Sequence, residues 1–227
     1  MNNQFFFDLL YKVKNSRFNK FQNRSYSQEG EDLILSKFFD GKRKGFFVDV
    51  GAFHPVRFSN TLKFYKLGWH GINIEARPGS KKLFDSIRKR DINVEYPVSD
   101  VASELVYYCF NEPALNGFSP QLTMERNGIG HYKVIKEIKM MTKRLDEILD
   151  EHLPIDQKID FMSIDVESFD LNVLKSNNWN KYKPEVILVE DLEFDFNNSS
   201  SITSYLGSNG YQMFARTFNT SLFKLIS

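Results

Sequence analysis

The chain has 227 residues, enough for one large domain with a substantial core, and 41% of them are hydrophobic, including 22 phenylalanines. The 30 basic and 29 acidic residues give a net charge of +1, which argues against a nucleic-acid partner because such proteins present strong positive charge. The single cysteine, Cys109, excludes an internal disulfide framework, and no apolar run approaches the ~18 residues of a membrane span, so a cytoplasmic protein is expected.

Residues 1–24 differ in character from the single domain expected over residues 25–227. Phe6, Leu9, Leu10 and Val13 fall at helical spacing, and five basic residues against one acidic residue, Asp8, give this segment a net charge of +4. The segment lacks a basic start, and Asp8 interrupts its apolar run, so no signal peptide is expected. We expect a basic amphipathic helix that either contacts a membrane surface or packs on the domain or on the second subunit of a homodimer. Packing is the simpler interpretation.

The rest of the chain alternates between strand and helix character, which predicts an α/β fold with a mostly parallel sheet. The strand at 45–51 is apolar almost throughout, as strands covered on both faces are. The first half is expected to begin with a helix at 31–39 and a strand at 45–51. A helix from Ser59 to Gly68, a strand at 71–76 and a helix from Pro78 to about Arg90 follow. Two further strands are expected at 92–99 and 104–110.

Residues 111–140 show no clear element, although NEPALNGFSPQ has turn chemistry, and a loop of this length in a compact domain is usually functional. The remainder is expected to contain a strand at 158–166, a helix in SFDLNVLKS, a strand at 185–191, the polar run NNSSS and two strands joined at Asn219 and Thr220. The predicted architecture is a doubly wound, mostly parallel sheet with an antiparallel C-terminal hairpin.

Carboxylates follow several of these strands: Asp49, Glu75, Asp165 and the pair Glu190 and Asp191. In open α/β sheets, ligands bind at the carboxyl ends of the strands, and an acid after the second strand suits ribose hydroxyls. The first turn, DVGAFHP, has neither the three glycines of the dinucleotide fingerprint nor the Gly-Lys-Ser/Thr of a phosphate loop, so a dehydrogenase is excluded. A nucleoside without a phosphate chain fits better, and S-adenosylmethionine is the common one.

Several motifs, in order, resemble the FkbM-type methyltransferase family: YSQEGEDLIL, GFFVDVGAFHPVRFSNTLKFYKLGWHGINIEARPGS and INVEYPVSD, followed by SIDVES and PEVILVED. The resemblance covers about residues 25–225. It implies a Rossmann-like methyltransferase fold, S-adenosylmethionine as donor, and methylation of hydroxyl groups, often on sugars or polyketide-type products. The family commonly has a glycine at the position of Ser168; we expect Ser168 to be tolerated there and to cap the following helix.

The resemblance also implies roles for individual residues. Asp49 and Gly51 would line the methionine end of the donor, and Glu75 would hold the ribose. Asp100 would lie near the adenine. The full set of expected cofactor residues is Ser27, Gln28, Asp49, Gly51, Glu75, Ala76, Ser99 and Asp100.

Two hypotheses address the chemistry of methyl transfer. His54 follows the first strand and has a near-neutral intrinsic pKa, so it is a candidate general base; alternatively it only holds its loop through a hydrogen bond. Asp165, Glu190 and Asp191 end two apolar strands and could bind Mg²⁺ or another divalent cation, with Asp165 taking part in catalysis. The alternative is that acids in this region bind substrate hydroxyls or cap the next helix.

Arg57, Asn60 and the 111–121 loop with Asn116 are expected to contact the acceptor. Arg57 suits a phosphate or carboxylate, or is simply solvated. The sequence therefore predicts an S-adenosylmethionine-dependent O-methyltransferase that acts on a sugar hydroxyl, in a nucleotide-activated sugar, a surface polysaccharide or another glycan. Two alternatives remain: an N-methyltransferase of the same fold, and a non-catalytic donor-binding partner in a glycan-synthesis complex.

Overall fold

The computed structural model describes residues 22–195 and 199–226. The amphipathic helix predicted within residues 1–24 lies outside this part of the chain, apart from residues 22–24. Across the described residues, none of the helices has both the length and the apolar character needed to cross a membrane.

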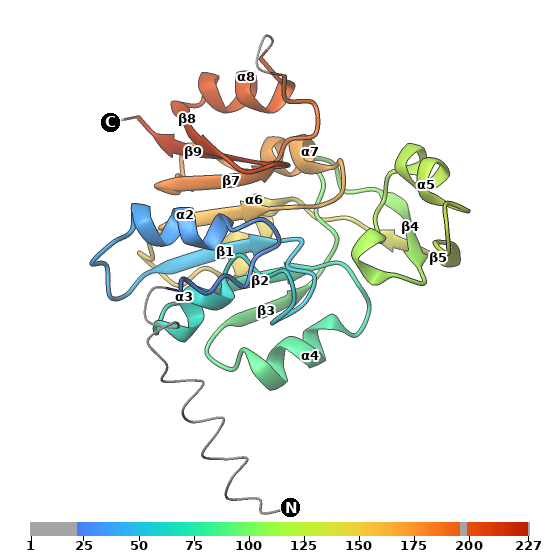
Figure 1. Ribbon diagram of the computed structural model, residues 1–227, viewed down its shortest axis with the longest axis horizontal. Coiled ribbons are helices and arrows are strands. Elements are labelled where there is room, and N and C mark those ends of the chain that lie inside the picture. The colour runs from blue at the N-terminus through green and yellow to red at the C-terminus, as the bar shows by residue number, and fades with distance from the viewer. Residues whose placement is uncertain (1–21, 196–198, 227) are drawn as a thin grey trace, which may run out of the picture.

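A seven-stranded sheet forms the centre of the molecule, in the order β3-β2-β1-β6-β7-β9-β8 (Figure 1). The five strands from β3 to β7 in this order run parallel, whereas β9 pairs antiparallel with both β7 and β8. The strands are β1 (Phe46–Val50), β2 (His70–Glu75), β3 (Ile92–Glu95), β6 (Phe161–Ile164), β7 (Val186–Glu190), β8 (Tyr211–Arg216) and β9 (Thr220–Leu225). The predicted Rossmann-like sheet with an antiparallel C-terminal hairpin is confirmed. Its strand order reverses between β1 and β6, where such folds bind ligands.

Both faces of the sheet are covered, which explains why its central strands are apolar throughout. Phe46 and Val48 of β1 pack in one apolar layer, and Phe47 packs in the layer on the other face. The first layer includes residues of α6 (Leu145–His152), α7 (Asp170–Lys175) and α8 (Ser201–Ser208); the second includes residues of α2 (Glu31–Phe38) and α3 (Leu62–Lys66). Helix α4 (Ser80–Ile87) contacts β2 and β3.

Helices α6 and α8 were not predicted from the sequence, and β3 ends earlier than predicted. Leu145, Ile148 and Leu149 of α6 are buried on one helical face, a spacing that could have predicted this helix. Helix α8 follows the polar run, where the Ser200 side chain accepts a hydrogen bond from the Thr203 backbone and caps the helix. Strand β3 ends at Glu95, two residues before Pro97, which has no N–H for a sheet ladder.

Residues 104–141 form an arm outside the main sheet, rather than a strand followed by an unstructured loop. Strands β4 (Glu104–Phe110) and β5 (Val134–Met141) pair antiparallel, with the short helices η2 (Pro113–Leu115) and α5 (Pro120–Arg126) between them. Figure 1 shows this arm to the right of the main sheet. The predicted strand at 104–110 is confirmed, but its partner was not predicted.

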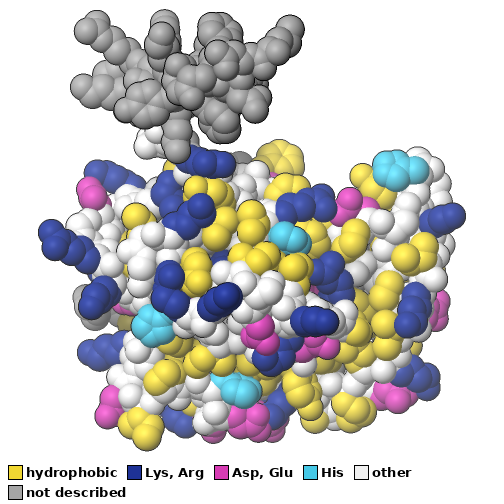
Figure 2. Space-filling view, turned by 90° about the horizontal axis from the view of Figure 1, so that it is seen from below, with side chains coloured by type: hydrophobic (Ala, Val, Ile, Leu, Met, Phe, Trp, Pro, Cys, Tyr) yellow, Lys and Arg dark blue, Asp and Glu magenta, His cyan; other side chains and the backbone are white. Residues whose placement is uncertain are grey.

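Charged and apolar side chains are interspersed on the surface seen from below in Figure 2. Basic side chains are spread over this face, with acidic and apolar groups between them, rather than gathered in one patch. This distribution agrees with the nearly balanced composition of the chain.

The turn between β6 and α7 has an unusual backbone. Glu167 and Ser168 have φ angles of 54° and 75°, in the left-handed region that favours glycine. Helix α7 starts after Phe169 and has no side-chain cap, so the expectation that Ser168 caps it is wrong. The backbone conformation at position 168 thus explains why the FkbM-type family commonly has a glycine there. Serine at this position is strained.

Ser168→Gly is therefore expected to stabilise the protein. A non-glycine residue in the left-handed region costs roughly 1–2 kcal/mol, whereas glycine costs somewhat more entropy on folding, so we expect the free energy of unfolding to rise by about 1 kcal/mol. Urea unfolding measures the change. Ser86→Gly, in the exposed part of α4, is the control and should destabilise by about 0.5–1 kcal/mol. Equal destabilisation by both variants would contradict the strain at Ser168.

Candidate functional site

A cavity opens at the switch point of the sheet, lined by the carboxyl ends of β1, β2 and β6 and closed by the arm. This first cavity has about 940 Å³ of empty space, counted out to its open mouth. Of the predicted site residues, it is lined by Gln28, Asp49, Gly51, Asn60, Glu75, Ala76, Asn116 and Asp165.

Gly51 has to be a glycine for two reasons. Its φ is 78°, and a Cβ atom at this position would lie 1.8 Å from the carbonyl oxygen of Asp165. Its backbone N–H donates to the carbonyl of Ile74 at 2.9 Å. Gly51 therefore lets the turns after β1 and β6 approach each other closely, with β2 alongside.

Asp49 lies at the buried end of β1, where 5% of its surface is exposed. Its Oδ2 accepts a hydrogen bond from the Thr61 hydroxyl at 2.9 Å. Burial raises the pKa of Asp49 to about 6, and the Thr61 hydrogen bond and the nearby Arg88 charge limit the rise. Asp49 is thus largely ionised at neutral pH and lines the cavity with a negative charge.

Glu75 connects two loops as well as lining the cavity. Its Oε2 accepts from the backbone N–H of Phe53 at 2.7 Å, and its Oε1 accepts from that of Arg77 at 2.8 Å. Burial raises the pKa of Glu75, and these two hydrogen bonds oppose the rise. Each carboxylate oxygen can accept a second hydrogen bond, so the carboxylate can also receive one from a ribose hydroxyl.

Three predicted cofactor residues, Ser27, Ser99 and Asp100, are not part of the cavity lining. The Ser27 hydroxyl hydrogen-bonds Asp32 at the start of α2. Asp100 Oδ1 accepts from the Asn172 amide at 2.9 Å and from the Ser99 hydroxyl at 3.2 Å, which turns this carboxylate toward α7.

The segment after β3 contributes other residues to the first cavity, Tyr96 and Val98. They stand one to four positions before the predicted Ser99 and Asp100. The segment after β3 thus reaches the cavity, but through residues other than the two that were predicted.

The arm supplies one wall of the first cavity, through Tyr107 and through residues of the 111–121 loop that was expected to contact the acceptor. Tyr107 and Phe118 line the cavity, with ring centroids 4.9 Å apart, and Phe118 lies edge-on to Phe169 at 6.2 Å. Burial raises the pKa of Tyr107, and the negative charge of Glu75 adds to this, so its hydroxyl stays protonated. No role was predicted for Tyr107, which the sequence analysis placed only within a strand.

A second cavity adjoins the first and shares Gln28, Asn60 and Asp165 with it. Arg57, predicted to contact the acceptor, lines this cavity and pairs with Glu112 at 2.9 Å. Asn60 donates to the Ser163 hydroxyl at 3.0 Å at the boundary of the two cavities. The cavity is acidic: it is lined by Glu29, Glu31, Glu112, Asp165, Glu167 and Glu190, against Arg57 and Arg126.

Asp165 and Glu190 form the electrostatic centre of the second cavity. The Asp165 side chain is accessible from the cavity but surrounded by protein; desolvation, and then the Glu190 charge, raise its pKa well above the usual value. Desolvation also raises the pKa of Glu190 to about 7, and its Oε2 has no hydrogen-bond partner among the described residues. Because both pKa values are raised, this pair is suited to taking up or releasing a proton.

The predicted metal site at Asp165, Glu190 and Asp191 is not formed. Asp191 lines neither cavity; its buried Oδ2 accepts from the hydroxyls of Ser200 at 2.7 Å and Ser221 at 3.5 Å. Consecutive residues of an extended chain point to opposite sides, so Glu190 and Asp191 do not face one site. Within residues 22–195 and 199–226, no group of three or more His, Cys, Asp or Glu side chains is arranged to hold a metal ion.

His54 lines neither cavity. Its Nδ1 accepts from the backbone N–H groups of Val56 and Arg57, both at 3.0 Å. Partial burial lowers the pKa of His54, and the charges of Arg77 and Arg57 lower it further, so the ring is neutral with its proton on Nε2. This geometry favours the alternative in which His54 holds its loop.

Comparisons with known proteins identify the family of the chain. A family model described as "Methyltransferase FkbM domain" matches residues 49–213, which is more than half of the chain. No curated protein matches the chain. A solved structure of a TehB-like SAM-dependent methyltransferase from Corynebacterium glutamicum ATCC 13032 Kitasato is similar at 8% sequence identity and a TM-score of 0.45, with 99% of this chain and 100% of that chain covered. The chain belongs to the FkbM methyltransferase domain family and is an S-adenosylmethionine-dependent methyltransferase.

Proposed function

We propose that this methyltransferase transfers a methyl group to a hydroxyl group of a sugar, in a nucleotide-activated sugar or a glycan. The observation that carries the proposal is the contact between the two cavities at Asp165: one suits the donor, and the other opens beside it and is lined by groups that hydrogen-bond hydroxyls. Carboxylate and amide side chains in the second cavity, such as Glu31 and Asn60, are suited to sugar hydroxyls.

The residues of the first cavity fit S-adenosylmethionine, which supplies an electrophilic methyl group when bound. Asp49 would bind the ammonium group of its methionine part, and Glu75 would accept hydrogen bonds from the ribose. The aromatic wall of Tyr107 and Phe118 would cover an apolar, planar base. The arm and the loop after β1 both line the cavity and would cover part of the bound donor.

Asp165 is the group best placed to receive the acceptor's proton. The ionised Asp165 carboxylate would accept the proton of the acceptor hydroxyl as that oxygen is methylated. Glu190 keeps the proton affinity of this carboxylate high through like-charge repulsion. Positioning both reactants in adjoining cavities supplies the rest of the rate, for which ~7–11 kcal/mol is available in well-oriented systems.

One observation favours the second candidate, methylation of an amine. The acidic side chains of the second cavity outnumber its basic ones. Its two basic residues are already paired, Arg57 with Glu112 and Arg126 with Glu167. The remaining acids of the lining have no basic partner within it: Glu29, Glu31, Asp165 and Glu190. An acceptor with an ammonium group would be attracted there. An amino sugar meets both requirements.

Donor binding can be tested first, without an acceptor. Asp49→Asn and Glu75→Gln are each expected to weaken S-adenosylhomocysteine binding about 10- to 100-fold, because each removes a charged hydrogen-bonding group that is worth ~1.5–3 kcal/mol. Isothermal titration calorimetry measures the effect. Asp100→Asn, which changes an acid outside the cavity, is the matched control and should bind as the wild type does. Wild-type affinity in both site variants would refute the assigned donor site.

The acceptor class can be tested with a matched pair of substrates, UDP-glucose and UDP-glucosamine, which differ in one hydroxyl and one amine. We expect transfer of radiolabelled methyl to an oxygen of one or both, located by mass spectrometry of the product. Methylation of the amine nitrogen alone would replace the O-methyltransferase proposal by the N-methyltransferase one. If neither is methylated, a panel of GDP- and dTDP-linked sugars follows; absence of transfer to every one would contradict a nucleotide-sugar acceptor.

The base can be tested by pH dependence once an acceptor is identified. Asp165→Asn should lower kcat 10²- to 10⁴-fold with little change in donor affinity. Because the base must be ionised and the pKa of Asp165 is raised, wild-type kcat should rise with pH over a range above that in which an ordinary aspartate titrates. Glu190→Gln removes the neighbouring charge, lowers the pKa of Asp165 and moves this rise to lower pH. His54→Asn, which keeps a hydrogen-bond acceptor in the loop, should stay within a few-fold of wild type; a loss as large as that of Asp165→Asn would restore His54 as the base.

A further inference from the structure

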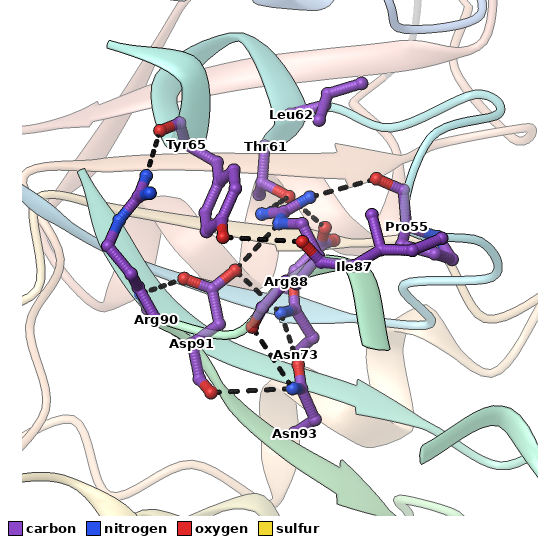
Figure 3. Close-up of polar contacts among 12 residues, drawn as sticks. Pro55, Thr61, Leu62, Tyr65, Asn73, Ile87, Arg88, Arg90, Asp91 and Asn93 are labelled. Carbon is purple, nitrogen blue, oxygen red and sulfur yellow. Dashed lines mark hydrogen bonds and ion pairs between the residues drawn. The ribbon is translucent and has the colours of Figure 1, made fainter. Parts of the chain in front are cut away.

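A buried arginine, Arg88, lies beside the end of β1 and is not explained by packing alone (Figure 3). It follows the last residue of α4, none of its surface is exposed, and it packs over the rings of Phe47 and Tyr65. A buried guanidinium is costly unless its donors are paired. The partners of Arg88 therefore indicate what the residue does.

One partner anchors Arg88 to the sheet. Its Nε donates to Asp91 Oδ2 at 2.8 Å, and the side chains of both residues are fully buried. Asp91 in turn accepts from the backbone N–H of Gly71 and from the amide of Asn73, both at 3.1 Å and both on β2. Figure 3 shows Arg88, Asp91 and Asn73 linked in this way. The guanidinium thus has a fixed position relative to β2.

The other partners lie on the side of the donor cavity. Nη2 of Arg88 donates to the Thr61 hydroxyl at 3.0 Å, and Nη1 donates to the carbonyl of Pro55 at 3.3 Å. Arginine can only donate, so the Thr61 oxygen is an acceptor in this contact and its single proton is free to point elsewhere. That proton reaches Asp49 Oδ2, 2.9 Å from the Thr61 oxygen. The chain of hydrogen bonds has one direction, from Arg88 through Thr61 to Asp49.

We propose that Arg88 is a positioning residue for the donor site, acting through Thr61 to hold the Asp49 carboxylate in its ionised, cavity-facing arrangement. The inference rests on the assignment of Asp49 to the donor site made above. Arg88 does not line either cavity, so it acts on the donor only through the residues that it holds.

The Pro55 contact extends this role to the loop after β1. Phe53 and Phe58 of this loop line the first cavity, and both have positive φ angles, 51° and 54°. Such conformations cost about 1–3 kcal/mol each and persist only where surrounding contacts impose them. The bond from Arg88 to the Pro55 carbonyl, together with the bond from Phe53 to Glu75, is such a contact.

The charges around Asp49 support the inference. Arg88 at the end of α4 lowers the pKa of Asp49, whereas Asp91 in the next turn and Glu75 on β2 raise it, as does burial. Without the Thr61 hydroxyl, one of the two stabilising contacts is lost, so the pKa of Asp49 rises further. Donor affinity should then fall at a higher pH than in the wild type.

The test compares Thr61→Val, which keeps the side-chain shape and removes the hydroxyl, with Thr61→Ser, which keeps the hydroxyl. S-adenosylhomocysteine binding is measured by calorimetry from pH 5 to pH 8. We expect Thr61→Val to bind at least fivefold more weakly at pH 7 and to lose affinity at a higher pH than wild type; Thr61→Ser should bind within about twofold of wild type, with an unchanged pH profile. A purely structural role would alter thermal stability but would not shift the profile.

Asp49→Asn is the reference variant that distinguishes failure of the positioning role from failure of the donor-site assignment. If Asp49→Asn loses affinity but Thr61→Val retains the wild-type affinity and profile, the positioning role is refuted and the donor site stands. If Asp49→Asn itself binds as wild type does, the assignment of Asp49 is wrong. If Thr61→Val does not fold, Arg88→Lys takes its place in the test. Lysine keeps the positive charge but cannot donate to three acceptors from one planar group, so the pH at which donor affinity is lost should rise as expected for Thr61→Val. Wild-type binding by Arg88→Lys would also refute the role.

Discussion

Burial of carboxylates at the carboxyl ends of parallel strands is the constraint on which this site depends. An ionised carboxylate removed from water must be hydrogen-bonded or paired, or its pKa rises. Glu75 and Asp49 are buried: Glu75 receives two backbone N–H groups, and Asp49 receives one hydroxyl backed by Arg88. Asp165 is instead exposed to the cavity and faces mainly other acids. The roles of these carboxylates differ with the number of hydrogen bonds and opposite charges that stabilise their ionised form. Glu75 and Asp49 are suited to holding a ligand, and Asp165 is suited to exchanging a proton.

The arm completes what the sheet alone leaves open. Two ion pairs tie it to the site: Arg57 in the loop after β1 with Glu112, and Arg126 of α5 with Glu167 after β6. Each joins the arm to a turn that carries a site residue. Neither pair is fully buried, so each contributes modestly to stability, and the aromatic contact of Phe118 with Phe169 adds apolar attachment. The arm therefore sets the boundary between the two cavities.

The sequence predicted the central sheet well because strands covered on both faces leave an unambiguous apolar signal, as in GFFVDVG. It predicted the strand-end acids for the same reason. It could not predict the arm, since β4 pairs with β5 across a connection of 23 residues in which no periodic pattern marks the partner. It also could not say which way an acid points once its strand has ended: Asp100 turns to Asn172, and Asp191 turns to two serines. These directions depend on tertiary partners distant in the sequence.

Backbone strain is concentrated where the two cavities meet. Gly51 approaches the Asp165 carbonyl so closely that no side chain fits between them, and Glu167 and Ser168 directly after Asp165 have left-handed conformations. A relaxed turn would not need such residues. Strained backbone persists at sites where the surrounding contacts over-determine it, and here those contacts are the approach of Gly51 and the pairing of Glu167 with Arg126. The turn is thus held in the one conformation that places the Asp165 carboxylate in both cavities.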